Sequence, residues 1–222
     1  MSGAGISAES GIPTFRGNDG LWKNYRAEDL ATPQAFHKDP NLVWEWYNWR
    51  KALVLKKNPN PAHYALIELK KKIPNLISVT QNVDGLHKRA GDHSIIELHG
   101  NLFRARCLNC PHITFAEHSI TPIDLCAACN RGNLRPDIVW FGEALDKTIM
   151  HDLYDVLTRC DLILVVGTSG VVYPAAGFAV EVRRRGGVVI EINIEMPRRD
   201  YPDDILIQGR AGDILPRIAK IV

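Results

Sequence analysis

The sequence lacks the long hydrophobic runs, the strong charge bias and the secretory leader that mark membrane, nucleic-acid-binding or exported proteins. No apolar run approaches the roughly 20 residues that span a bilayer, and no signal-peptide pattern is present. Lys and Arg total 27 against 25 Asp and Glu. The two basic clusters, Lys70–Lys72 and Arg183–Arg185, are typical of solvated helix ends. We therefore expect a cytoplasmic protein that binds neither membrane nor nucleic acid.

Cysteine is scarce, at five residues, but four of them form two pairs. Cys107-x-x-Cys110 is followed after fifteen residues by Cys126-x-x-Cys129, a spacing typical of a four-thiolate zinc site. Disulfides are the alternative interpretation, and a reducing compartment disfavours them. Four thiolates complete a tetrahedral shell with no open position, so the pattern predicts one structural zinc ion rather than a catalytic one.

Four short β-rich runs, at residues 76–80, 94–98, 161–166 and 187–192, are separated largely by helical patterns. This alternation predicts an α/β fold with a doubly wound, parallel, Rossmann-like sheet. Open α/β sheets bind their ligands at the carboxyl ends of the strands. Polar residues occur at or just past those ends, namely Asn82, His99, Thr168 and Asn193. Cys160, directly before one run, is predicted to be a small buried hydrophobic residue.

Two segments do not fit this alternation. Residues 26–74 are rich in tryptophan and have helical periodicity, and residues 101–136 contain the paired cysteines. We expect these segments to form a small domain with a helical part and a zinc-ribbon part. The small domain would be inserted into a Rossmann-like NAD-binding domain made of residues 1–25, 75–100 and 137–222.

Gly3, Ala4, Gly5 and Ala8 fit the Gly-x-Gly-x-x-Gly/Ala fingerprint of dinucleotide-binding turns. Glycines in that fingerprint permit a tight turn and a close backbone approach to a pyrophosphate at a helix N-terminus. Ordinary loops also contain short glycine patterns, so this match alone is weak. An apolar strand normally precedes the turn, but only Met1–Ser2 stand before it here. We expect either a strand of about five residues upstream or another segment in its place.

Four further motifs accompany the glycine turn and the cysteine pairs. They read Thr-Gln-Asn-Val-Asp at 80–84, Leu-His-Gly-Asn at 98–101, Val-Trp-Phe-Gly-Glu at 139–143 and Gly-Thr-Ser at 167–169. Together and in this order, they closely resemble the sirtuin family of NAD-dependent protein deacylases, over essentially the whole chain. The resemblance implies transfer of an acyl group from lysine to ADP-ribose, with release of nicotinamide and O-acyl-ADP-ribose.

The resemblance also assigns roles to individual residues. His99 resembles the family's catalytic base, which deprotonates a ribose hydroxyl after nicotinamide has left. Imidazole suits that task because its pKa lies near the working pH, although a histidine outside such a motif is more often structural. The residues that match the family's NAD contacts are Gly3, Ala4, Gly5, Ala8, Phe15, Arg16, Trp22, Gln81, Asn82, Val83, Asp84, Gly167, Thr168, Ser169, Asn193, Ile194, Glu195 and Ala211.

The segment Val139, Trp140, Phe141, Gly142 and Glu143 matches the place where sirtuins bind the acyl-lysine peptide as an added strand. Backbone hydrogen bonds then give affinity with little sequence preference. From the residues alone, a hydrophobic core strand is the preferred interpretation. The resemblance leads us to expect many acyl-lysine proteins or peptides as partners, and a monomeric enzyme.

Tyr47, Arg50 and Ala35 bear on which acyl group is removed. In a helix predicted from about residue 42 to 55, Arg50 falls on an apolar stripe with Tyr47, three positions earlier. Such a pair can bind a carboxylate, and with Ala35 leaving room it resembles the class III sirtuins that remove succinyl and malonyl groups. We expect removal of acetyl groups as well. The open alternative is an internal ion pair of Arg50 with Glu45, Glu68 or another acid.

Three other classes of function share some of these features. A nicotinamide dehydrogenase has the glycine turn but needs no zinc ribbon. A zinc-ribbon binding module explains only the cysteines. An NAD-dependent protein ADP-ribosyltransferase is the strongest alternative, because it breaks the same bond in NAD.

Overall fold

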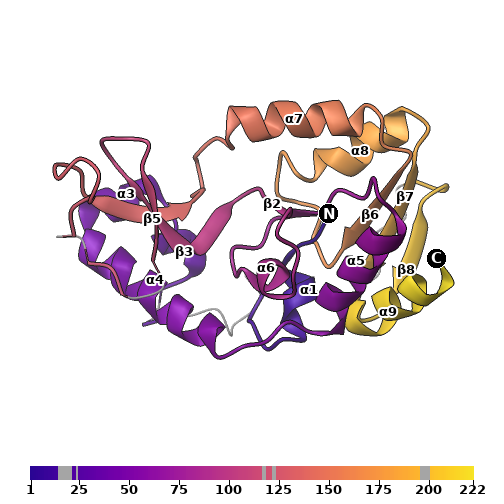
Figure 1. Ribbon diagram of the computed structural model, residues 1–222, viewed down its shortest axis with the longest axis horizontal. Coiled ribbons are helices and arrows are strands. Elements are labelled where there is room, and N and C mark those ends of the chain that lie inside the picture. The colour runs from indigo at the N-terminus through magenta and orange to yellow at the C-terminus, as the bar shows by residue number, and fades with distance from the viewer. Residues whose placement is uncertain (15–21, 24, 117–118, 122–123, 196–200) are drawn as a thin grey trace.

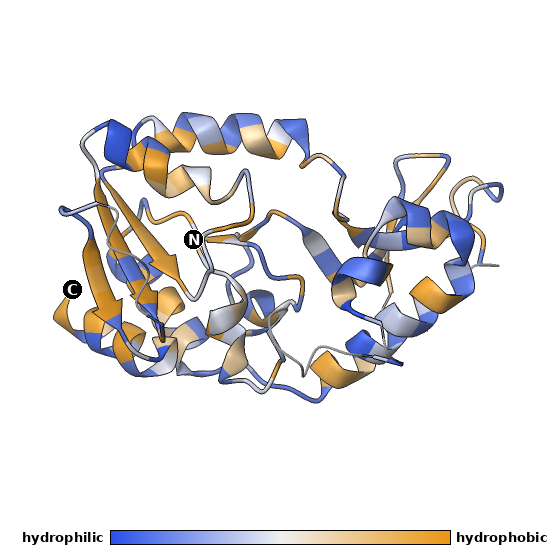
Figure 2. Cartoon of the chain, turned by 180° about the vertical axis from the view of Figure 1, so that it is seen from behind, coloured by the Kyte–Doolittle hydropathy of each residue, from blue (hydrophilic) through white to orange (hydrophobic). Residues whose placement is uncertain are grey.

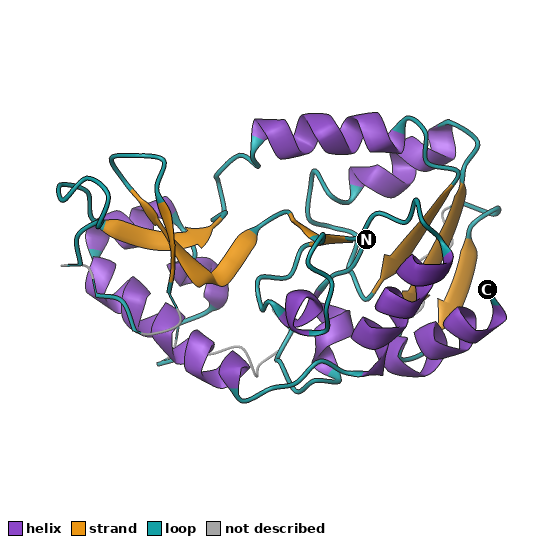
Figure 3. Ribbon diagram, viewed as in Figure 1, coloured by secondary structure: helices purple, strands orange, loops and turns teal. Residues whose placement is uncertain are grey.

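The computed structural model describes residues 1–14, 22–23, 25–116, 119–121, 124–195 and 201–222. A parallel sheet with flanking helices occupies one end of an elongated molecule, and a smaller unit of helices and an antiparallel sheet occupies the other (Figure 1). Figure 3 shows the two groups of strands as separate. The prediction of a doubly wound α/β fold is confirmed.

The parallel sheet contains five strands in the described residues. β1 (Val79–Thr80) pairs with β2 (Ile96–Glu97), and β6 (Leu162–Val166), β7 (Val188–Asn193) and β8 (Ile205–Gln208) pair in that order. β1 and β2 are shorter than the predicted runs at 76–80 and 94–98. Before β2, the Ile95 amide donates to the Asp92 carbonyl, so a turn takes up residues that we had expected in the strand. β8 was not predicted.

Met1 and Ser2 lie between β1 and β6 and join the two parts of the sheet. The Ser2 amide donates to the Val79 carbonyl at 2.9 Å, and the Val166 amide donates to the Met1 carbonyl at 2.9 Å. The α-amino group of Met1 donates to the Leu164 carbonyl at 2.7 Å. These bonds pair backbone groups that would otherwise be buried without partners, at a cost of about 1 to 3 kcal/mol each. The resulting order is β2, β1, Met1–Ser2, β6, β7, β8.

Helices cover both faces of this sheet (Figure 1). Successive residues of a strand point to opposite faces. Ile163 and Val165 accordingly share one core with α7 (Lys147–Leu157) and α8 (Gly177–Arg184). Val166 shares the other with α5 (Pro61–Lys72) and α9 (Ala211–Ile221). In Figure 2 the strands β6, β7 and β8 are hydrophobic, whereas the helices beside them have both hydrophobic and hydrophilic residues.

The smaller unit has its own core, formed by three helices and an antiparallel sheet. The helices are α2 (Ala27–Leu30), α3 (Pro33–Lys38) and α4 (Pro40–Leu55), and the strands β4 (Ile113–Phe115), β3 (Gly100–Cys107) and β5 (Leu134–Ile138) lie in that order. α4 confirms the helix predicted at about 42–55. It starts at Pro40 because the Asp39 carboxylate caps it, accepting from the Leu42 amide at 3.0 Å.

Some details differ from the sequence-based expectations. Residues 61–72, expected in the small domain, form α5 and pack against α9 beside the parallel sheet. Lys70 and Arg183 do lie near helix ends, but they pair with Asp92 and Asp204, both at 2.5 Å, instead of being solvated. Cys160 is half-buried, and its thiol donates to the Leu162 carbonyl at 3.1 Å. None of the described helices is long and apolar enough to cross a membrane.

Two buried histidines beneath the sheet make the fold sensitive to acid. His63 and His87 are 1% and 3% exposed, and their ring centroids are 4.9 Å apart. His63 Nδ1 accepts from the Asn60 amide, and His87 Nε2 lies 2.9 Å from Ser2 Oγ. Burial lowers the pKa of His63 to about 3 and that of His87 to about 4, so both imidazoles are neutral in the folded protein at pH 7.

We expect the free energy of unfolding to fall as the pH drops from about 6.5 to about 4. Below pH 6.5 the unfolded chain binds protons at His63 and His87, whereas the folded chain does not bind them until the pH nears their lowered pKa values. Each histidine then destabilises the fold by about 1.4 kcal/mol per unit of difference between its unfolded and folded pKa. Denaturant titrations across this range measure the slope. His63→Phe should reduce the slope, whereas replacing the exposed His151 by alanine should not. An unchanged slope in His63→Phe would contradict this assignment.

Candidate functional site

A cavity of about 1260 Å³ lies where the carboxyl ends of the parallel strands face the smaller unit. It exceeds the roughly 300 to 1,000 Å³ of typical small-ligand pockets, so a dinucleotide and part of a second ligand can share it. His99 lines it, as do most of the predicted NAD contacts: Gly3, Ala4, Gly5, Ala8, Gln81, Asn82, Val83, Gly167, Thr168, Ser169, Asn193, Ile194, Glu195 and Ala211. Phe15 and Arg16 lie outside the described residues.

Glycines bring two loops into contact at the floor of this cavity. A Cβ atom on Gly5 would lie 2.7 Å from the Gly167 Cα, and one on Gly3 would lie 2.8 Å from the Thr168 Cβ. Gly167 has a φ of +58°, in the left-handed region that favours glycine. The amides of Gly3 and Gly5 donate to the carbonyls of Val166 and Gly167. In this structure the glycines therefore serve the packing of two loops, in addition to any approach of a ligand.

Amide side chains fix the same loops to one another. Asn82 Nδ2 donates to the Gly3 carbonyl at 3.0 Å and lies 3.1 Å from Ser7 Oγ. Thr168 accepts from two sides, through its hydroxyl from Gln81 Nε2 at 3.2 Å and through its carbonyl from Asn193 Nδ2 at 2.9 Å. The ends of β1, β6 and β7 are thereby held as one surface before any ligand binds, which lowers the ordering cost of binding.

His99 follows β2 and faces the cavity from between the two halves of the molecule. Its Nδ1 lies 2.9 Å from the Gln81 carbonyl oxygen. A carbonyl only accepts, so Nδ1 carries the proton and Nε2 has the free lone pair. Burial lowers the pKa of His99, while the bond to Gln81 acts in the opposite direction. The imidazole is therefore neutral at pH 7 and can accept a proton at Nε2.

Three predicted site residues do not line the cavity as the structure describes it. Trp22 is 8% exposed and packs in the core of the smaller unit, 6.2 Å from Trp49 between ring centroids. Ala35 packs against the same core, and Ala31 lines the cavity instead. Asp84 is 5% exposed and accepts at 2.9 Å from the amide of Leu86, the first residue of α6 (Leu86–Arg89). Burial raises the pKa of Asp84.

The segment predicted to bind peptide is a turn at the cavity wall rather than a core strand, because β5 ends at Ile138. The Glu143 carboxylate accepts from both guanidinium NH groups of Arg135, at 2.5 and 2.9 Å, and from the Trp140 amide at 2.9 Å. Arg135 also stacks 3.4 Å from the Trp140 ring centroid. Glu143 thus shapes the turn from within, and Phe141, 49% exposed, projects from it.

Tyr47 and Arg50, which the spacing placed on one helix face, both line the cavity from α4. The Tyr47 hydroxyl accepts from Trp140 Nε1 at 2.8 Å, and burial raises its pKa well above the usual value. Arg50 lies 5.1 Å from the Trp46 ring centroid. Burial lowers the pKa of Arg50, while Tyr47 and Asp84 act in the opposite direction.

The acids that we considered as partners of Arg50 make other contacts. Glu45 pairs with Lys23 at 2.5 Å, and Glu68 pairs with Lys71 at 2.7 Å. Neither pair includes Arg50. Asp84 instead acts electrostatically on Arg50 and, against the larger effect of burial, raises its pKa, so an acid other than these two interacts with the guanidinium.

The four paired cysteines meet at one point of the smaller unit. Their sulfur atoms lie within 4.8 Å of one another, and the distances from Cys107 to Cys129 and from Cys110 to Cys126 are both 3.7 Å. A tetrahedral zinc ion with bonds of about 2.3 Å separates its sulfur ligands by about 3.8 Å. The sulfur positions therefore fit one zinc ion.

Sequence reasoning missed several residues that line the cavity. The loop 171–174 follows the predicted Gly-Thr-Ser motif, and its Val171 and Tyr173 are 59% and 75% exposed. The position of this loop after the end of a predicted strand could have indicated that it lines the ligand site. Glu9 and Arg210 also line the cavity; no motif singled them out, because they approach it from helix ends far apart in the sequence.

Comparison with known proteins identifies the family to which this fold and cavity belong. The model of the Sir2 family matches residues 3–174. An NAD-dependent protein deacylase of Thermococcus kodakarensis is 49% identical over all of this chain and 89% of its own length. A mutant Sir2 homologue in complex with 2′-O-acetyl ADP ribose superposes with a TM-score of 0.91 at 45% identity, over all of this chain and 89% of that one.

A complex of Sir2 with a p53 peptide and NAD+ superposes with a TM-score of 0.84 at 31% identity, over 99% of this chain and 90% of that one. Such similarity extends over the sheet, the smaller unit and the cavity between them. Both the sequence match and the superposition include the strand ends and the cysteine cluster. The chain therefore belongs to the Sir2 family.

Proposed function

We propose that this protein is an NAD-dependent protein-lysine deacylase. The observation that carries the proposal is the position of His99. His99 lines the same cavity as the dinucleotide-type glycine loops and as Tyr47 and Arg50, and the bond from its Nδ1 to the Gln81 carbonyl leaves Nε2 as the proton acceptor. One imidazole thus stands between a place for a dinucleotide and a place for an acyl group.

NAD would lie along the strand ends, with its adenosine side near Asn193, Glu195 and Ala211. Its nicotinamide side would lie near Gln81, Asn82 and His99. Bound NAD supplies a ribose carbon that accepts the acyl oxygen as nicotinamide leaves. Gln81 and Asn82 present amides of the kind that pair with a carboxamide and with ribose hydroxyls. We propose Phe15 and Arg16 as further contacts on sequence resemblance alone.

His99 acts as the general base in this proposal. The Gln81 carbonyl fixes its tautomer, so Nε2 can take a proton from a ribose hydroxyl without rearrangement. A neutral resting imidazole is required for this step, and the lowered pKa of His99 provides it at pH 7. The proton transfer follows the departure of nicotinamide.

The acyl-lysine peptide is proposed to add as a strand along residues 139–143. The amides of Val139 and Phe141 donate to the carbonyls of His99 and Ala31. A peptide would therefore pair with the outward carbonyls of this turn and with the Gly142 amide. The main chain of the substrate makes these contacts, so the proposal implies many target proteins.

We propose that succinyl and malonyl groups are removed as well as acetyl groups, with their carboxylate held by Arg50 and Tyr47. Arg50→Met should lose desuccinylation and demalonylation selectively. A carboxylate left without its guanidinium in a buried channel costs about 3 to 5 kcal/mol. Deacetylation should persist or improve, because acetyl has no carboxylate. Tyr47→Phe should act in the same direction by about 0.5 to 1.5 kcal/mol.

Steady-state assays with acetyl, succinyl and malonyl versions of one peptide measure this selectivity. Arg26, whose side chain is 74% exposed, provides the matched control in Arg26→Met, which should change none of the three rates. Equal losses of acetyl and succinyl activity in Arg50→Met would make Arg50 a structural residue and would remove it from the acyl site.

We propose two domains, a Rossmann-like NAD-binding domain and a small domain containing the zinc ribbon, and assign residues 61–72 to the former because α5 packs on α9. We also propose that the enzyme acts as a monomer, since one chain supplies all the named site residues. A cytoplasmic location is proposed because a reducing compartment keeps four paired cysteines from forming disulfides and leaves them able to bind zinc.

Nicotinamide release distinguishes this function from ADP-ribosyl transfer. The protein should release nicotinamide from NAD rapidly when an acetyl-lysine peptide is present, and only at background rate with the same peptide unacetylated. A transferase would consume NAD with either peptide and would attach labelled ADP-ribose to protein. That second result would overturn the deacylase assignment.

A further inference from the structure

The chain passes from one half of the molecule to the other at His99. β2 ends at Glu97 and β3 begins at Gly100, so at this crossover two residues, Leu98 and His99, separate the parallel sheet from the antiparallel one. The Leu98 amide donates to the Thr80 carbonyl on the sheet side, at 2.9 Å. The His99 carbonyl accepts from the Val139 amide on the other side, at 3.0 Å. The position of the imidazole therefore depends on how the two halves are held.

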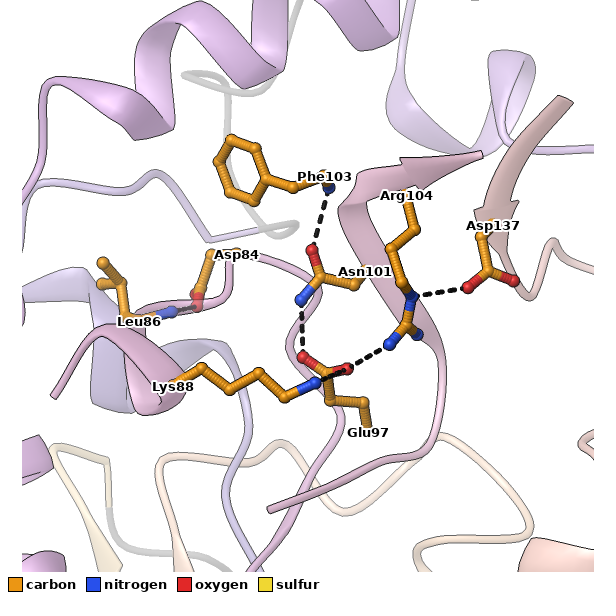
Figure 4. Close-up of polar contacts among 8 residues, drawn as sticks. All are labelled: Asp84, Leu86, Lys88, Glu97, Asn101, Phe103, Arg104 and Asp137. Atoms are coloured by element: carbon orange, nitrogen blue, oxygen red, sulfur yellow. Dashed lines mark hydrogen bonds and ion pairs between the residues drawn. The ribbon is translucent and has the colours of Figure 1, made fainter. Parts of the chain in front are cut away.

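Glu97 is the centre of a polar cluster at this crossover (Figure 4). Its side chain is 6% exposed, and its carboxylate accepts from Lys88 Nζ at 2.8 Å, from Arg104 at 2.9 Å and from Asn101 Nδ2 at 2.5 Å. Lys88 belongs to α6, whose His87 contacts Ser2 of the parallel sheet while its Leu86 packs in the core of the smaller unit. Asn101 and Arg104 belong to β3. One carboxylate thus joins both sides of the crossover.

The cluster extends to the return crossover and is balanced in charge. Arg104 Nε donates to Asp137 of β5 at 2.7 Å. The ladder between β3 and β5 is interrupted between Gly100 and Ala105, so this ion pair joins the strands where backbone pairing is broken. Lys88 and Arg104 oppose the charges of Glu97 and Asp137.

Gly100 makes the crossover tight. Its φ is +84°, and a Cβ atom there would lie 2.0 Å from the Asp137 carbonyl oxygen. β3 and β5 therefore touch directly beside His99, with no side chain between them. A small change in their angle to the sheet would move the imidazole, and a displacement of about 1 Å can cost a hundredfold in rate.

We propose that Glu97 is a positioning residue that holds His99 at its working position by tying α6 to β3 across the crossover. Neither Glu97 nor its partners line the cavity in the described residues, so the effect is indirect. The inference rests on the proposed deacylase function. A carboxylate is needed, because it accepts from all three donors while matching two cationic ones.

Glu97→Gln tests this role, because it preserves shape but points an amide group at cationic donors. We expect kcat for removal of acetyl from an acetyl-lysine peptide to fall about ten- to a hundredfold. Exchange of labelled nicotinamide into NAD precedes the proton transfer assigned to His99, so it should stay within about threefold. The KM for NAD should change equally little, because the NAD-lining loops are held by other bonds.

Asp204→Asn is the matched control. Asp204 is also a buried carboxylate, 8% exposed at its side chain and paired with Arg183, and neither residue lines the cavity. It should lower the melting temperature while leaving exchange and deacetylation in their wild-type ratio. If Glu97→Gln does not fold, Lys88→Met is measured in its place. The Lys88 side chain is 36% exposed, and its replacement removes only the contact between α6 and Glu97.

The deciding variant should lose deacetylation while keeping exchange. If it keeps kcat within twofold, or if exchange and deacetylation fall by the same factor, Glu97 is only structural and the proposal is wrong. Failure of the wild-type protein to deacetylate the peptide would instead overturn the proposed function.

Discussion

Replacing His99 by alanine is expected to reduce NAD-dependent deacylation at least a hundredfold while leaving NAD affinity close to that of the wild type. General bases contribute about 10² to 10⁴ in rate, and in this cavity His99 has the free imidazole nitrogen placed for that role. NAD affinity should persist, because the loops that we propose to bind it are fixed by Asn82, Gln81 and Thr168.

Single-turnover assays with an acetyl-lysine peptide, together with calorimetric titration of NAD, measure the two quantities separately. The control variant is His93→Ala, which removes an exposed histidine from the turn before β2. It should have wild-type turnover. Near-normal turnover in His99→Ala would eliminate His99 as the base.

Replacing Cys126 by serine is expected to unfold the smaller unit and abolish activity. Structural zinc contributes roughly 10 to 16 kcal/mol of apparent binding energy in small finger peptides, which is as large as the roughly 5 to 15 kcal/mol that separates folded from unfolded domains. Cys126 is fully buried, so the substitution also places a serine hydroxyl in the hydrophobic core. The same unit supplies Tyr47 and Arg50, so the cavity would lose one wall.

Elemental analysis and thermal unfolding test this expectation. The wild type should contain one zinc ion per chain, and Cys126→Ser should contain far less and unfold at lower temperature. Cys160→Ser, outside the cluster, should keep its zinc and its stability. A metal-free protein with full activity and unchanged melting would contradict a structural zinc site.

Residues at strand ends were predictable, because a local pattern encodes them. His99 and Thr168 each follow an apolar run, and parallel strands bring such positions together at one edge of a sheet. The cysteine cluster was predictable for a similar reason, since two short turns of fixed spacing bring four thiolates together.

Other features depend on contacts between distant segments. Trp22 and Ala35 pack in the core of the smaller unit instead of lining the cavity, which only the tertiary packing of α2 to α4 determines. The helical pattern of residues 61–72 was correct, but its partner α9 lies far along the chain. Glu97 drew no attention because its three donors come from α6 and β3, and no spacing rule joins them.

The central claim is tested most directly by mass spectrometry of an acetyl-lysine peptide incubated with the protein and NAD. The account predicts that free lysine peptide, nicotinamide and O-acetyl-ADP-ribose appear in equal amounts, and that none of them forms without NAD. Formation of NADH, attachment of ADP-ribose to the peptide, or removal of acetyl in the absence of NAD would contradict it.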